Sequence, residues 1–300
     1  MKRVYVFIIA GLLAMTSFSQ DNNFLVYSFK GNVSVIQNNA EAKAKIGNVL
    51  TSNAKIKLAS ASSVTMVCNQ AAMFTISKAG TYSLSQFKDS CVTSSSSITA
   101  NYLRYVWSQM TSHGEGAPGT NRKAFMNTVG AVSRSVNNIW IDPRLDTVNY
   151  SSGEFPLSWK SYADADEFEF MLYSNANAKK ADFTTVVKKL KIPITSFVKN
   201  LKPGNTYYWT AAVKGEQNDE WKVLNIVSNE NYETLVNTLK TQGPSSESAA
   251  QQSYRIAFML EDAHYLSEAY QYYLKAATSE PTNALYRSTL MSFKKDYEIK

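Results

Sequence analysis

The spacing of apolar residues changes along this 300-residue chain, and that change limits what it can fold into. Residues 24–88 and 140–227 hold short runs in which apolar and polar side chains alternate, which is the period of a β-strand. From Ser228 onward the apolar residues recur every three or four positions, as on one face of an α-helix. Because 300 residues also exceed what one core usually fills, we expect a multidomain, mainly β protein with a short α-helical C-terminal region.

The N-terminus carries the layout of a secretory signal peptide, residues 1–19. Lys2 and Arg3 precede the apolar run 4–15, and small residues lead to a predicted cleavage between Ser19 and Gln20. The run is shorter than the ~18–20 residues that span a bilayer, and no later segment is apolar enough to cross one. We expect a periplasmic or secreted protein without a transmembrane span after cleavage; an uncleaved anchor is the alternative.

Composition narrows the class of partner. Hydrophobic residues make up 44% of the chain and aromatic residues 12%, which is enough for packed cores and argues against disorder. Without Lys2 and Arg3, 29 basic residues face 24 acidic ones. This mild excess can favour anionic partners but falls short of the dense basic stripe of a nucleic-acid binder. We therefore expect no nucleic acid partner.

Residues 20–93 are predicted to form a small antiparallel β-domain. β-branched and aromatic runs follow one another between glycines, at 24–29, 33–36, 56–58, 64–68, 74–76 and 81–84. Four segments resemble the FecR-like domain of bacterial envelope proteins: Gly31-x-Val33, Lys45-x-Gly47-x-Val49-Leu50-Thr51, Ala54-x-Ile56 and Ser63-Val64-x-Met66-Val67. The family usually has an Asp-Gly turn next, where this chain has Asn69-Gln70-Ala71. The resemblance covers about a quarter of the chain.

Cys68 and Cys91 are the two cysteines of the chain. Export would permit a disulfide between them, worth about 3 kcal/mol in the chain-entropy model because the closed loop holds about two dozen residues. Alternatively, Cys68 is a buried apolar residue ending the run 64–68. The sequence does not supply the Cα separation that a bridge requires, so both interpretations stay open.

Residues 94–139 are predicted to connect the β-rich regions. Ile98, Tyr102, Tyr105, Val106 and Met110 recur at helical spacing, which predicts one amphipathic helix. The glycine-rich segment 113–119 is predicted to be a loop and the clearest internal break. Residues 123–134 show no decisive pattern.

Residues 140–227 are predicted to form a second β-domain. The run 155–159 predicts a strand with an inward Trp159, and 167–173 alternates acidic with apolar residues. The motif Leu201-x-Pro203-Gly204-x-x-Tyr207 resembles the tyrosine corner of fibronectin type III domains, in which the tyrosine hydroxyl bonds back to the preceding turn. The resemblance implies a β-sandwich with Trp159 in its core and a last strand at 221–227.

Residues 228–300 are predicted to be helical, with helices beginning at Ser228 and spanning 253–265, 267–278 and 284–297. The middle two resemble one tetratricopeptide repeat, with small or aromatic residues at the expected places: Ala257, Ala269, Tyr273 and Ala276. The usual first-helix Trp and Tyr are replaced by Ser253 and Leu260. A single repeat cannot bury its own apolar face, so we expect it to pack on the helix at Ser228, on a β-domain or on another chain.

Catalytic and metal-binding patterns are sparse. His113, His264 and two distant cysteines cannot supply the ligands of a zinc site, and neither histidine has a partner at the spacing of a nucleophilic motif. Asp164, Asp166, Glu167 and Glu169 form an acidic cluster that could act in acid–base catalysis or hold Ca²⁺. The other interpretation is a solvated turn and strand face, and we expect no cofactor, metal or catalytic residue.

Two groups of side chains are candidates for binding a partner. Lys188 and Lys189 belong to a basic stretch between predicted strands, where they could contact anionic envelope polymers or protect a sheet edge from aggregation. Tyr272 is expected at the surface, while Tyr270 and Tyr273 are expected to be buried. Tyr265 is the second aromatic candidate.

The resemblances imply recognition modules. FecR-like regulators also carry a transmembrane helix and a cytoplasmic segment that controls a sigma factor; neither is found here, so that role does not carry over. We expect an exported, non-catalytic binding or adaptor protein of the bacterial cell envelope, acting in signalling or assembly, with proteins, peptides or glycans as partners. The alternative is a carbohydrate-active or hydrolytic enzyme using Asp164, Asp166 and Glu169.

Overall fold

The computed structural model describes residues 22–69, 72–91, 100–111, 119, 121–126 and 138–299. The predicted signal peptide with its cleavage site, the residues after Asn69 in the predicted turn, and nearly all of the predicted loop 113–119 lie outside these residues. Several antiparallel sheets and a set of helices make up the described part, which confirms the predicted fold class at that level. Within these residues, no helix is both long enough and apolar enough to cross a bilayer.

The N-terminal β module, residues 22–91, consists of two four-stranded sheets in the orders β4-β1-β6-β7 and β3-β2-β5-β8. Their strands are β1 (Asn23–Lys30), β2 (Val33–Gln37), β3 (Ala40–Lys43), β4 (Val49–Thr51), β5 (Lys55–Leu58), β6 (Ser63–Cys68), β7 (Ala72–Ile76) and β8 (Gly80–Ser83). All pairings in these sheets are antiparallel, as predicted. β3 was not predicted, because its four residues are all exposed and carry no apolar alternation.

β1 is buried on both faces, which connects the N-terminal β module to the rest of the molecule. Phe24 and Val26 point into the module's own core, whereas Leu25 and Tyr27 belong to the larger core that continues into the helices. Alternate residues of a strand point to opposite sides, so one short strand contributes to two cores.

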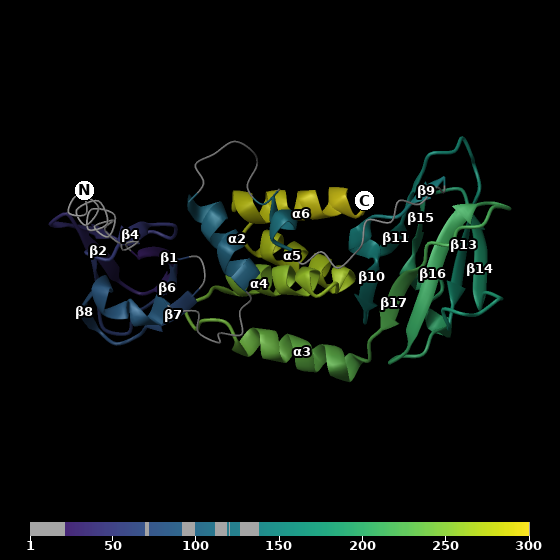
Figure 1. Ribbon diagram of the computed structural model, residues 1–300. Coiled ribbons are helices and arrows are strands. Elements are labelled where there is room, and N and C mark those ends of the chain that lie inside the picture. Colours follow the sequence, from purple (N-terminus) through teal and green to yellow (C-terminus); the bar gives the residue numbers. More distant parts are fainter. Residues whose placement is uncertain are drawn as a thin grey trace, which may run out of the picture.

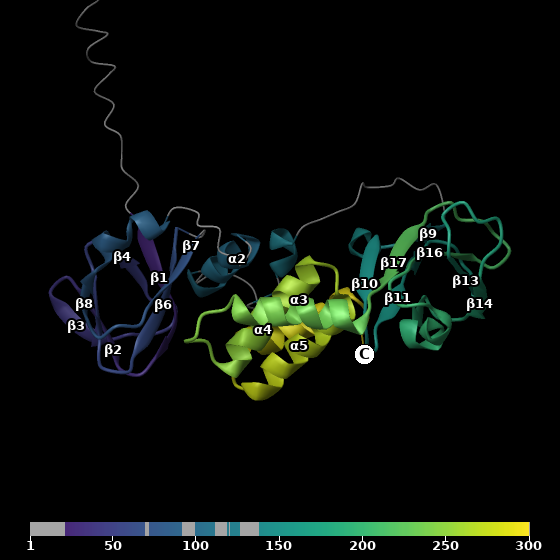
Figure 2. The same ribbon diagram turned by 90° about the horizontal axis from the view of Figure 1, so that it is seen from below.

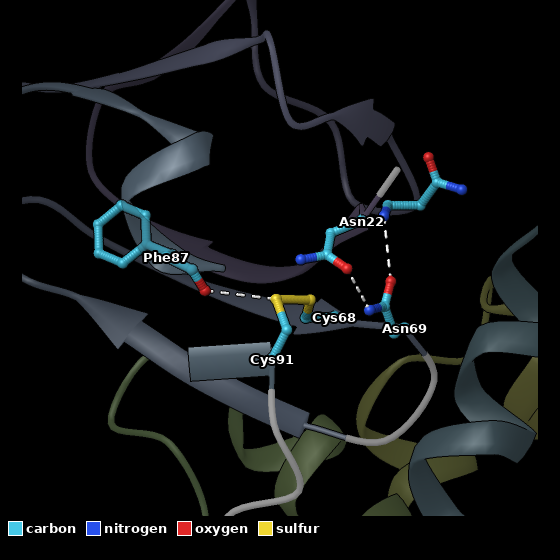
Figure 3. The surroundings of a disulfide bond; sticks show 6 residues. Asn22, Cys68, Asn69, Phe87 and Cys91 are labelled. Atoms are coloured by element: carbon cyan, nitrogen blue, oxygen red, sulfur yellow. Dashed lines mark hydrogen bonds between the residues drawn. A yellow bond between two sulfur atoms is a disulfide. The ribbon is translucent and has the colours of Figure 1, made fainter. Parts of the chain in front are cut away.

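A disulfide joins Cys68, the last residue of β6, to Cys91 in the short helix η2 (Asp89–Cys91), with Cα atoms 5.3 Å apart (Figure 3). Cys68 is also fully buried in the core of the module. Next to it, the Asn69 side chain accepts a hydrogen bond from the backbone N–H of Asn23 at 3.2 Å. Both ends of the module are therefore tied to the end of β6.

The second β module, residues 138–227, holds a five-stranded sheet in the order β10-β17-β16-β13-β14 and two strand pairs, β11–β15 and β9–β12. Their bounds are β9 (Ile139–Trp140), β10 (Thr147–Tyr150), β11 (Pro156–Ser158), β12 (Lys160–Ser161), β13 (Phe168–Tyr173), β14 (Phe183–Val187), β15 (Lys191–Pro193), β16 (Thr206–Val213) and β17 (Lys222–Ile226). β10 and β17 are parallel, and the other pairings are antiparallel.

Stacked aromatic rings form the core of the second β module. Trp159 is buried as predicted, and its ring stacks on Phe170 of β13 at 6.4 Å, which in turn stacks on Trp209 of β16 at 5.8 Å. The predicted bond of the Tyr207 hydroxyl is also present: it accepts the backbone N–H of Lys202 at 2.9 Å. The strand pairs and the five-stranded sheet therefore share one core.

The helical module consists of α2 (Ala100–Thr111), α3 (Asn229–Thr241), α4 (Ala249–Asp262), α5 (Leu266–Ser279) and α6 (Ala284–Asp296). Ser228 caps α3 by accepting the backbone N–H of Asn231. α4 begins before the predicted Ser253, because Ser248 and Gln251 form a capping box at its N-terminus. The helix predicted between the β-domains is α2, and it packs on α4: Tyr105 stacks on Phe258 with ring centroids 4.8 Å apart.

The helical module lies between the two β modules, although most of it follows both in the sequence (Figure 1). The second view shows the same order of β-sheets, helices and β-sheets (Figure 2). The apolar faces of α4 and α5 are therefore buried by α2, α3 and contacts with both β modules.

A buried arginine joins the segment after α2 to the helices. Arg122, in the short helix η3 (Arg122–Phe125), is fully buried. Its Nε lies 2.9 Å from Glu261 of α4, and its Nη2 lies 2.9 Å from Asp296 of α6. Glu261 also accepts the hydroxyls of Tyr273 at 2.9 Å and Tyr297 at 3.2 Å. The carboxylates and hydroxyls around Arg122 compensate for its lost hydration.

A buried carboxyl attaches the second β module to α5. Glu268 is 2% exposed, and its Oε1 accepts the backbone N–H groups of Ser151 at 2.6 Å and Ser152 at 2.9 Å. Ser267 donates to the carbonyl of Ser152 at 2.6 Å. Burial raises the pKa of Glu268, against the opposing effect of the two amide hydrogen bonds.

Replacing both cysteines by alanine tests the disulfide. The bridge closes a loop with a sequence separation of 23 residues, so Cys68→Ala with Cys91→Ala should lower the free energy of unfolding of the N-terminal β module by about 3 kcal/mol. Urea unfolding followed by circular dichroism, with and without reductant, measures this. Reduced wild type should match the double variant, and a variant as stable as oxidised wild type would contradict the prediction.

The buried Glu268 predicts a pH dependence of stability. Because its pKa is raised in the folded protein, its contribution to stability is full below the ordinary glutamate pKa of about 4.3 and is lost as pH rises through the raised value. Glu268→Gln keeps an acceptor for the two amides and carries no charge. Urea unfolding from about pH 4 to 7 should therefore show wild type losing stability relative to Glu268→Gln. Glu268→Ala, which has no acceptor, should be less stable than the glutamine variant at every pH. A constant difference between wild type and Glu268→Gln would refute the assignment.

Candidate functional site

A cleft of about 500 Å³ opens between the N-terminal β module and the helical module. We call it the N-terminal cleft. Its apolar side chains are Phe29 of β1, Ile46, Met110 of α2, and Leu285 of α6. Its polar residues come from β1, from the segment that leads into α4, and from the turn between α5 and α6: Lys30, Ser245, Ser246, Glu247, Ser248, Gln251, Glu280 and Asn283. Five separate stretches of the chain meet there.

A narrow recess lies beside this cleft and shares Met110, Gln251, Leu285 and Tyr286 with it. We call it the tyrosine recess, because five tyrosines line it: Tyr27, Tyr102, Tyr105, Tyr254 and Tyr286. Its volume is about 30 Å³, room for a water molecule or the tip of a small side chain.

Hydroxyl pairs hold the rings of the tyrosine recess in place. Tyr27 and Tyr102 are 2.8 Å apart at their hydroxyl oxygens, and Tyr105 is bonded to Tyr254, which contacts Thr289 at 2.9 Å. Burial raises the pKa of Tyr105 to about 12. The recess is therefore lined by neutral hydroxyls at ordinary pH.

A buried ion pair forms the floor of the junction, the region where the N-terminal β module meets the helical module. Arg255 of α4 donates from Nε to Glu247 Oε1 at 2.8 Å and from Nη2 to Oε2 at 2.9 Å, and neither side chain is more than 1% exposed. The third nitrogen of Arg255 donates to the carbonyl of Leu239 at 2.8 Å. The hydroxyl of Tyr27 donates to Glu247 at 2.7 Å, across 220 residues of sequence. β1 is therefore bonded directly to the segment that leads into α4.

Hydroxyl side chains extend this polar junction along the sheet. Ser246 contacts Ser28 of β1 at 2.7 Å and Thr65 of β6 at 2.6 Å. Close by, Gly243 leaves room for the guanidinium: a Cβ there would lie 1.8 Å from Arg255 Nη2. Residues 243–247 thus pass closely between the sheet and α4.

The predicted acidic cluster lies away from the cleft, in the second β module. Asp164 and Asp166 are exposed in the turn before β13, and Glu167 pairs with Lys214 at 2.7 Å. Glu169 stands in β13 between Val186 and Ala212 of the neighbouring strands. Across the residues that the structure describes, no three His, Cys, Asp or Glu side chains are grouped so that they could hold a metal ion.

The predicted partner-binding residues are also outside the N-terminal cleft. Lys188 and Lys189 are exposed directly after β14, which is an edge strand of the five-stranded sheet. Tyr272 and Tyr265 are half-buried, and the ring of Tyr265 lies 6.0 Å from that of Tyr232 in α3. Their role in binding stays a prediction.

The residues that build the cleft and its floor were not predicted as site residues; among them are Tyr27, Met110, Glu247 and Arg255. The available local signal was Ser248 with Gln251, a capping box that marks the start of α4. It locates a helix end but does not show what packs against it.

No protein-family model matches this chain, and the search of curated proteins found no match. The resemblances to FecR-like, fibronectin type III and tetratricopeptide families therefore remain predictions from motifs.

Removing one charge of the Glu247–Arg255 pair tests how much this pair contributes to stability. Glu247→Gln leaves Arg255 buried without a counter-ion, so we expect the free energy of unfolding to fall by roughly 3–5 kcal/mol in urea. Glu247→Leu with Arg255→Met should recover most of that loss, because no buried charge remains. The matched control is Glu41→Gln, which breaks an exposed pair with Lys57 and should cost less than about 1 kcal/mol. Equal losses for Glu247→Gln and Glu41→Gln would rule out the buried pair as a stabilising contact.

Proposed function

We propose that this protein is an exported, non-catalytic adaptor of the bacterial cell envelope that acts in signalling or assembly and binds a peptide segment of a partner in the N-terminal cleft. The cleft carries the proposal. Its volume of about 500 Å³ lies within the usual range for ligand sites. It also adjoins the tyrosine recess, which offers space for the tip of a side chain.

The lining of the cleft suits a peptide. Phe29, Met110 and Leu285 offer apolar surface, and the side-chain nitrogen of Gln251, whose oxygen caps α4, is able to donate to a peptide carbonyl. Apolar pockets with a few polar groups that fix orientation are typical of binding sites.

The module families form part of the same proposal. The paired four-stranded sheets fit a FecR-like domain, and the Tyr207 bond with the buried Trp159 fits a fibronectin type III-like sandwich. The α4–α5 hairpin followed by Pro281 fits a tetratricopeptide-like repeat. These would be recognition modules with a fixed spacing, because buried ion pairs fix the helices that lie between the two β modules.

The hydrolytic alternative has less support. Asp164 and Asp166 are exposed in a turn, and Glu169 lies on an open strand face. Acid–base catalysis instead calls for carboxyls that converge on a substrate, with pKa values matched to the reaction.

Site-specific photocrosslinking in the native envelope tests the proposal. A photoreactive phenylalanine at Leu285, in the cleft, should give a discrete crosslinked partner. The matched control is the same probe at Met291, which is 70% exposed on the same helix and outside the cleft lining. The crosslink from position 285 should disappear when Met110→Glu is added. Absence of a crosslink at 285, or the same products from 285 and 291, would contradict peptide binding in the cleft.

A further inference from the structure

A second cavity, of about 220 Å³, lies where the second β module meets the end of α6. We call it the α6 cavity. Four cationic side chains reach it from four segments: Lys123 of η3, Arg144 of η4 (Pro143–Leu145), Lys160 of β12, and Lys295 of α6. It shares no lining residue with the N-terminal cleft.

Two of the acidic residues in the lining are neutralised within the protein. Asp142 accepts Arg144 Nε at 2.8 Å and the Arg144 backbone N–H at 3.0 Å. Its pKa is lowered, because these hydrogen bonds outweigh the effect of burial. Asp296 lies 2.9 Å from Arg122 Nη2 and also contacts Lys123. The third acid, Glu298, is exposed at the chain end.

Donors in the wall of the cavity lack acceptors. Among the described residues, neither the buried indole Nε1 of Trp159 nor the buried Nη1 of Arg144 has a hydrogen-bond partner. An oxygen of Asp296 lies 3.9 Å from Arg144 Nη1, too far for a hydrogen bond. Buried donors in folded proteins are nearly always paired, so these two nitrogens keep unused hydrogen-bonding capacity beside the cavity.

Two exposed lysines in the lining of the cavity also lack acidic partners in the described part of the chain. Across the described residues, neither Lys160 nor Lys295 forms an ion pair. Lys160 instead lies over the ring of Trp140, with its Nζ 5.2 Å from the ring centroid. A flat indole beside two free ammonium groups favours a ligand with both a ring and a negative charge.

We propose that the α6 cavity binds a small sugar-like ligand that bears a carboxylate or a phosphate. Lys160 and Lys295 attract its anionic group at the rim, close to the unpaired nitrogens of Arg144 and Trp159. This site is independent of peptide binding in the N-terminal cleft, so either proposal can fail alone.

Isothermal titration of the mature protein with three probes tests the site. Glucuronic acid supplies a carboxylate, glucose 6-phosphate supplies a phosphate, and glucose supplies neither. We expect saturable binding of at least one anionic sugar, weakening as salt is raised, and no binding of glucose. Whichever anion binds more tightly identifies the group that the cavity prefers.

Variants at the rim locate the binding. Lys160→Gln with Lys295→Gln should raise the Kd of the anionic sugar at least tenfold. The matched control, Lys188→Gln with Lys189→Gln, removes two exposed lysines elsewhere in the second β module and should leave the Kd unchanged. No binding of either anion, equal binding of glucose, or equal effects of the two double variants would overturn the proposal.

Discussion

The buried pair of Glu247 and Arg255 is the interaction on which the placing of the N-terminal β module depends. It bonds α4 to the segment before it, and through Tyr27 it reaches β1. Further along α4, Glu261 meets Arg122 in a second buried pair. One helix, buried from Ser253 to Asp262, thus carries a cation and an anion without water around either. Such charges stay buried only while their partners remain in position, which ties the fold of each module to that of the next.

Local patterns in the sequence predicted local structure well. The alternation in β13 follows from three buried side chains facing one core, and the cap at Ser228 marks the start of α3. The Tyr207 bond spans five residues, so its motif is contiguous in the sequence. β3 was missed because an exposed hairpin strand has no apolar period to read.

The candidate sites could not be predicted in the same way. Arg122 and Glu261 are 139 residues apart, and an isolated arginine in a polar stretch looks like a surface residue until the fold surrounds it. Both the N-terminal cleft and the α6 cavity are assembled from segments distant in the sequence. The acidic cluster, by contrast, was visible because its members are adjacent. Adjacency in sequence placed them on one turn and strand, without bringing them into either cavity.

The helices α3 to α6 are translated last but lie between the two β modules (Figure 1), and this order affects folding during synthesis. A ribosome completes the first β module and α2 long before residue 247 exists, so α4 and the segment before it do not yet cover the side of β1 with Leu25 and Tyr27. Contacts between distant segments form late in folding, and hydrophobic surface stays exposed to water until they form. Nascent chains of this protein should thus need a chaperone, and premature stop codons upstream of α4 should yield aggregation-prone fragments.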